Sequence, residues 1–164
     1  MLQAFSDWLV TTWISHLFAD HIWTLIMSQT IHIIGVAVVM ISVAIINLRI
    51  LGATGRSQSV ASITFQFTPW IWWAILVLLL TGTLQILAEP AREIMNNVMR
   101  IKMLLLITVC GITYYYSKAL RTDPNFLDVG GAHRTLGLSL ASLSIVFWVS
   151  IVVCGRFIAY VGAI

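Results

Sequence analysis

One histidine, His32, stands near the start of a long apolar stretch that holds few other polar side chains. Imidazole is a common axial ligand of haem iron, and a methionine thioether can be its partner. Ionisable groups inside a membrane are functional candidates because burying them there is costly. The sequence therefore predicts that His32 binds a haem iron. The alternative is that His32 only forms a hydrogen bond to Gln85 or to a serine of a neighbouring helix.

Other polar side chains are expected at the depth of His32. His32 precedes Arg49 by seventeen residues, which is about 25 Å along a helix. If Arg49 marks the inner edge of a hydrocarbon core about 30 Å thick, His32 lies just inside the outer edge. The same counting along the other apolar runs, from a basic residue or a proline at the inner end, predicts one outer polar layer that also contains Gln85, Lys102 and Arg156.

This outer layer has the composition of a cofactor site. We expect Arg100, Lys102 and Arg156 to neutralise the propionates of haem b, because such anions need cationic partners near the interface. Met103 is expected near the same depth as His32, where its thioether could be the partner ligand of the iron. A haem there could pass electrons between quinone in the bilayer and a redox partner outside. Lys102 and Arg156 could equally extend to lipid headgroups.

His16 and His21 are weaker candidates for metal ligands. With a nearby methionine they would suit copper, which accepts both imidazole and thioether ligands. Their spacing is not the i and i+4 pair expected of two ligands on one helix. His16 could also serve as the second axial ligand of a haem if the N-terminal segment folds back, and so could His32 of a second protomer.

No nucleophile, base and acid occur together at one depth, and no phosphate-binding glycine loop or CxxC pair occurs. The nine basic residues are scattered without the basic run that tracks nucleic acid. We therefore expect an electron-transfer or structural subunit more than an independent enzyme, and no nucleic-acid partner. A non-catalytic anchor or assembly subunit of a larger complex is an alternative function.

Composition defines the elements that must position these residues. Hydrophobic residues make up 60% of the 164 residues and charged residues 9%, with a mean hydropathy of +0.97. Soluble domains carry about 25% charged residues, so this surface must meet lipid. We expect an all-α, integral membrane, four-helix up-and-down bundle in one domain, residues 1–164. Its spans are predicted at about 22–48, 69–88, 101–120 and 135–160.

The first 21 residues have helical periodicity of apolar and polar side chains, which predicts an amphipathic helix lying in the interface. No basic residue occurs before Arg49, and basic residues then follow the first span. By the positive-inside rule, we expect both termini outside, which in a bacterial inner membrane is the periplasm.

Two further features predict helix packing. Pro69 with the adjacent tryptophans is typical of a helix start at the inner interface. Small residues favour the close approach of another helix. They form a stripe in the fourth span, Gly137, Ala141 and Ser144, and Gly82 and Gly111 are expected to act similarly.

Four patterns follow one another along the chain: IHIIGVAVVMISVAIINLRILG, PWIWWAILVLLLTGTLQILAEP, RIKMLLL and GRFIAY. Together, from about residue 28 to residue 160, they resemble a family of uncharacterised four-span bacterial inner-membrane proteins. The family is distantly similar to four-helix membrane cytochromes b and to copper-resistance membrane proteins, which implies haem or copper as a cofactor. The chain lacks the paired histidines of two-haem membrane cytochromes. The shared residues are His32, Thr81-Gly82, Lys102 and Gly155-Arg156.

Overall fold

The computed structural model describes residues 2–13, 15, 22–54, 57–127 and 131–161. Its long helices are α3 (Ile22–Ile50), α4 (Val60–Ala88), α6 (Asn97–Thr122) and α7 (Ala132–Val161). Two shorter helices are α1 (Leu2–Val10) and α5 (Pro90–Ile94). The four long helices are each long and apolar enough to cross a membrane. The prediction of an all-α bundle with four spans is therefore confirmed.

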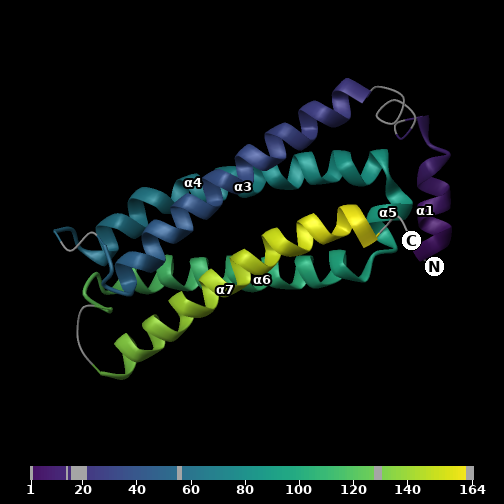
Figure 1. The fold of residues 1–164 in the computed structure, drawn as a ribbon. Helices are drawn as coiled ribbons and strands as arrows, with labels where there is room; N and C mark the ends of the chain where they lie inside the picture. The colour runs from purple at the N-terminus through teal and green to yellow at the C-terminus, as the bar shows by residue number, and fades with distance from the viewer. Residues whose placement is uncertain (1, 14, 16–21, 55–56, 128–130, 162–164) are drawn as a thin grey trace.

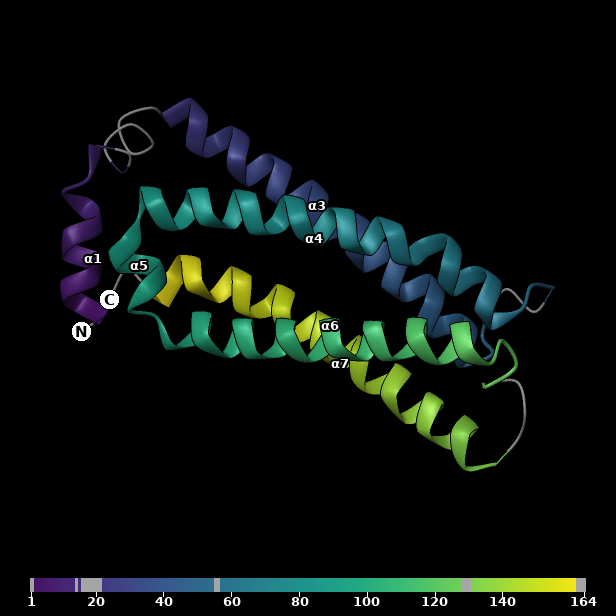
Figure 2. The ribbon, with the colours of Figure 1, turned by 180° about the vertical axis from the view of Figure 1, so that it is seen from behind.

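The long helices run up and down in an elongated bundle (Figure 1). α3 packs chiefly on α4, and α6 packs chiefly on α7, while α3 also contacts α7 and α4 contacts α6. The connections α3–α4 and α6–α7 lie at one end of the bundle, and α1 and α5 lie at the other (Figures 1 and 2). We call the end with α1 and α5 the outer end, following the predicted orientation.

The second span starts at Val60, nine residues before Pro69, so the prediction of a helix start at Pro69 is wrong. The start is fixed by Ser59, whose side-chain oxygen accepts a hydrogen bond of 3.1 Å from the backbone N–H of Ser62. Pro69 then lies inside α4, where it donates no backbone hydrogen bond. Pro69 therefore does not mark the inner edge of the membrane.

The N-terminal helix is shorter than the predicted 1–21 segment, since α1 ends at Val10. Its contacts are with α5, and it turns Ser6 and Leu9 inward while Phe5 and Trp8 are exposed. α1 thus lies across the outer end of the bundle, with Phe5 and Trp8 exposed (Figure 2). Its position in a membrane interface stays a prediction. Residues 16–21 of the predicted helix lie outside the described residues.

The core is formed by buried residues that recur at alternating spacings of three and four, which place them on one face of a helix. On α3 and α7 these are Val39, Val43, Ile46 and Ile50, and Ala141, Ser144, Trp148 and Ile151. Many large apolar side chains remain exposed around the outside, including Trp70, Trp73, Leu104, Ile107 and Val146. An apolar exterior of this extent fits a lipid bilayer, so the chain is a multi-pass membrane protein.

The predicted small-residue stripe on α7 is confirmed. Tyr116 of α6 donates a 2.7 Å hydrogen bond to the backbone oxygen of Gly137, and a Cβ atom there would stand 2.5 Å from Leu127 Cδ2. Ser144 of the same stripe contacts α3. The parallel prediction for Gly111 is wrong, because Gly111 is exposed and a Cβ atom there would meet nothing within 4 Å.

Candidate functional site

His32 forms a hydrogen bond to the neighbouring helix α4. Its Nδ1 lies 2.8 Å from the hydroxyl oxygen of Thr81. That hydroxyl also lies 2.8 Å from the carbonyl oxygen of Val77, one turn earlier on α4, and donates to it. A hydroxyl has a single proton, so Thr81 accepts from Nδ1–H of His32. The imidazole therefore keeps an unprotonated Nε2, whose lone pair is available to a ligand.

The residue after Thr81 keeps space open beside the imidazole. A Cβ atom on Gly82 would stand 3.6 Å from Cε1 of His32, the ring carbon between the two nitrogens. That distance is ordinary van der Waals contact, so a longer side chain at position 82 would crowd the ring. Ser28 donates a second hydrogen bond across the same helix pair, 3.2 Å to the backbone oxygen of Thr81. Two contacts thus fix the position of His32 against α4.

Lys102 brings a positive charge from α6 to the same site. Lys102 lies within electrostatic reach of His32, of Glu93 on α5 and of Cys154 on α7. A Cβ atom on Gly155 of α7 would stand 3.9 Å from Lys102 Nζ, so the missing side chain at 155 leaves room for the ammonium group. The four spans therefore converge at one polar level near the outer end, as predicted for His32 and Lys102.

Gln85 lies at this level as well, but for a different reason from the count along the helix that predicted it. Counting from Pro69 is not valid, because Pro69 lies inside α4. Gln85 nevertheless follows Thr81 by one helical turn, and residues four apart share a helix face. Its side-chain Nε2 is buried and has no hydrogen-bond partner among the described residues. An amide donor without a partner in a membrane interior is a candidate contact for a bound ligand.

The structure does not group Arg100 and Met103 with His32. Successive helical residues differ by about 100° in direction. Met103 therefore differs in direction from Lys102 by about 100°, and its side chain is 37% exposed. Arg100, two residues before Lys102, is also exposed. Arg156 is exposed on α7 beside Gly155 and forms a polar or electrostatic interaction.

The predicted copper ligands, His16 and His21, lie outside the described residues. Within the part of the chain that the structure describes, no group of three or more His, Cys, Asp or Glu residues could hold a metal ion. A metal bound to His32 in one chain would have to bring further ligands of its own, as haem does with its four ring nitrogens.

Sequence reasoning missed Thr81 as the partner of His32, although it noted the Thr81-Gly82 pair through the family resemblance. It also missed a second polar cluster toward the inner end, centred on Asn47. The signal for that cluster was present in the sequence. Asn47 stands in an apolar span, and Thr64, Thr68, Thr113 and Ser117 recur at spacings of four, which place polar groups on one face of a helix.

These features define the class: a four-span helical membrane protein with a polar level of four converging helices near its outer end. The chain belongs to the family described as "Family of unknown function (DUF6644)", whose model matches residues 5–161. No curated protein and no solved structure matches the chain.

Proposed function

We propose that this chain is a small electron-transfer subunit of the membrane in which His32 is an axial ligand of haem b. The observation that supports it is the 2.8 Å hydrogen bond from Nδ1 of His32 to Thr81. Metal-ligating histidines almost always donate their other ring N–H, which fixes the ring and makes the ligating nitrogen more basic. A haem bound there supplies one-electron redox chemistry.

The charges around His32 favour a ligand with acidic groups. Lys102 is a cation within electrostatic reach of His32, and the carboxylate of Glu93 lies within reach of Lys102. An ammonium group in a membrane needs anionic or carbonyl partners, so a haem propionate would add to the stabilisation that Glu93 supplies. Arg156, which follows Gly155 on α7, is the second candidate partner for a propionate. Arg100 faces another direction and has a smaller part in the proposal.

The packed helices restrict where a porphyrin could lie. The hollow between α3 and α4 beside this level is lined by Thr24, Leu25, Ser28, Leu84 and Ala88, and it has no room for even one water molecule. A porphyrin therefore does not fit within that seam, and it would reach Nε2 of His32 from outside the α3–α4 contact. His133, at the inner start of α7, is too far away to be a second ligand. The second ligand would come from the N-terminal segment or from a second copy of the chain.

The test is an absorption spectrum of the detergent-purified protein, reduced with dithionite, after expression with haem supplied. We expect a Soret band and stoichiometric iron in the wild type, and neither in His32→Ala. His133→Ala is the matched control, because His133 is an exposed histidine at the opposite end. A wild type without a Soret band, or a His32→Ala variant that keeps it, would remove the proposal.

A quinone headgroup is a second candidate ligand, favoured by the unpaired Nε2 of Gln85. A quinone carbonyl accepts hydrogen bonds, which Gln85 and Lys102 can donate, while a quinol hydroxyl can donate to Nε2 of His32. One Nε2 lone pair cannot serve both ligands, so the quinone is an alternative to the haem. Gln85→Leu and His32→Ala should each weaken binding of a short-chain quinone in nanodiscs. Equal quinone binding by wild type and Gln85→Leu would reject this candidate.

We further propose a bacterial inner membrane with both termini in the periplasm. The support is the first connection: no basic residue precedes Arg49, and Arg49 and Arg56 then follow the first span. Reporter fusions at residue 54 and at the C-terminus should report opposite sides of the membrane.

A non-catalytic anchor subunit remains the alternative function, and it predicts a His32→Ala variant that still co-purifies with a larger partner. A copper-handling protein predicts copper in metal analysis.

A further inference from the structure

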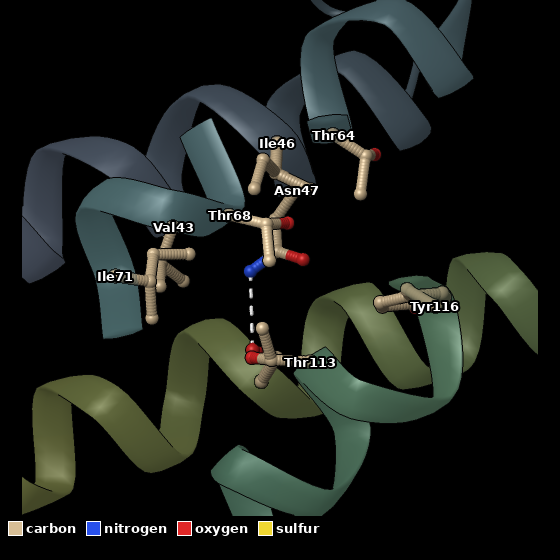
Figure 3. A pocket seen from close by; sticks show the side chains of 9 residues that line it. Val43, Ile46, Asn47, Thr64, Thr68, Ile71, Thr113 and Tyr116 are labelled. Atoms are coloured by element: carbon tan, nitrogen blue, oxygen red, sulfur yellow. Dashed lines mark hydrogen bonds between the residues drawn. The ribbon is translucent and has the colours of Figure 1, made fainter. Parts of the chain in front are cut away.

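A second polar cluster lies between the four spans in the inner half of the bundle, far from His32. It surrounds a small cavity of about 10 Å³. Figure 3 shows the side chains that line it, coming from α3, α4, α6 and α7. The lining residues are uncharged: Val43, Ile46, Asn47, Thr64, Thr68, Ile71, Thr113, Tyr116 and Ser144.

Three of the hydroxyl groups around the cavity have already used their protons. Thr64 donates to the backbone oxygen of Val60 at 2.8 Å, and Thr113 donates to that of Val109 at 2.9 Å. Tyr116 donates to Gly137. Each hydroxyl has only one proton, so what these oxygens still offer is lone pairs. The cavity is therefore rich in acceptors, and a guest that donates hydrogen bonds would complete it.

Two hydrogen bonds between side chains join the helices around the cavity. Asn47 Nδ2 lies 3.1 Å from the hydroxyl oxygen of Ser144, which joins α3 to α7 (Figure 3). Thr68 and Ser117 hydroxyls lie 3.3 Å apart, which joins α4 to α6. Asn47 is 2% exposed. An amide carries two N–H protons, so Asn47 keeps one for a further acceptor.

We propose that this cavity binds one water molecule that bridges the spans. A cavity needs about 10–15 Å³ for the centre of one water, and this one has that volume. The water would donate to hydroxyl oxygens of Thr64 and Thr113 and accept from Asn47. Water is favoured over a sodium ion because the lining carries no charge, and a bare cation in a membrane interior needs a compensating anion. This inference does not depend on the proposed haem or quinone site.

The direct test is oxidative footprinting of the protein in nanodiscs with a brief X-ray pulse. The pulse makes hydroxyl radicals from water in place, and a bound water oxidises the side chains beside it. We expect oxidation of Tyr116 and Ile71, although they are only 3% and 1% exposed. Leu120, one turn beyond Tyr116 and 0% exposed, does not line the cavity and is the internal control. Tyr116 and Ile71 as unreactive as Leu120 would overturn the proposal.

A matched pair of variants checks the same inference through stability. Thr113→Val removes one acceptor from the cavity with little change in volume. Thr108→Val is the control, because exposed Thr108 donates to the carbonyl of Leu104 in the same way. Thr113→Val should abolish oxidation of Ile71 and lower the unfolding midpoint by about 2–4 °C, as loss of one buried hydrogen bond implies in a chain of this size. Thr108→Val should do neither.

The salt present during thermal unfolding distinguishes a bound water from a bound sodium ion. A water site predicts the same unfolding midpoint in sodium chloride and in choline chloride of equal concentration. Stabilisation by sodium that is lost in Thr113→Val would replace the water with a cation and overturn the assignment.

Discussion

The substitution Thr81→Val tests whether the hydrogen bond between α3 and α4 positions the imidazole. Valine has nearly the shape of threonine but lacks the hydroxyl, so the change removes the acceptor that lies 2.8 Å from Nδ1 of His32. Thr81 is buried, and water cannot easily replace the lost partner. The Nδ1–H group is then left unsatisfied in an apolar seam, which costs about 1–3 kcal/mol.

Two consequences follow for Thr81→Val. The unfolding midpoint should fall by about 2–4 °C for each kcal/mol lost in a chain of this size. Haem affinity should fall by about 10–100-fold, which is the usual effect of removing the hydrogen-bond partner of a ligating histidine. His32→Ala, by contrast, should abolish haem binding. Titrating haem into the apoprotein in detergent and following the Soret absorbance measures these affinities.

Thr83→Val is the matched control on the same helix. Thr83 donates to the carbonyl of Leu79 at 2.8 Å, as Thr81 donates to Val77, but it is exposed and no hydrogen bond joins it to His32. Thr81→Ser should keep most of the affinity because it restores a hydroxyl at the same position. If Thr81→Val and Thr83→Val bind haem equally well, the hydrogen bond does not position a ligand and the reasoning fails.

Four further substitutions test the packing and the charge. Gly137→Ala should destabilise the protein by about 1–3 kcal/mol in thermal unfolding, because its Cβ atom would lie 2.5 Å from Leu127 Cδ2. Gly111→Ala should be neutral or stabilising by up to about 1 kcal/mol. Equal unfolding midpoints for the two variants would contradict this prediction. Asn47→Ala should lower stability by about 1–3 kcal/mol, since it breaks the bond to Ser144, and an unchanged midpoint would show that the bond contributes nothing. Lys102→Gln should weaken the binding of haem more than that of its dimethyl ester, and equal losses would remove the propionate role.

The spans could be predicted from the sequence because an apolar run long enough to cross a bilayer has few other stable arrangements. The start of α4 could not be predicted by the same criterion. The residues before Pro69 include Ser62, Thr64, Gln66 and Thr68, which lower the local hydropathy. In the bundle, Thr64 and Thr68 face inward and are buried. The sequence alone does not distinguish a polar residue that packs against another helix from one that faces water.

Counting residues along the helices predicted depth but not direction. It placed His32 and Lys102 at one level, and the structure has them within electrostatic reach. It placed Arg100 and Met103 close to the same level as well, yet each residue turns the helix by about 100°, and these side chains point elsewhere. The rotation of each helix about its own axis depends on its neighbours, and the sequence of a single chain carries little of that information.

The two polar contacts of α3 show how that rotation is fixed in lipid. Apolar side chains pack about equally well against lipid and against each other, so they hold the rotation of a helix only weakly, whereas hydrogen bonds between helices select one orientation. His32 bonds to α4 and Asn47 bonds to α7. Asn47 follows His32 by fifteen residues, which is about 22 Å along the helix and a difference of about 60° in direction. α3 is therefore held at two depths against two different neighbours, and a twist that broke the inner contact would also turn the imidazole away from Thr81.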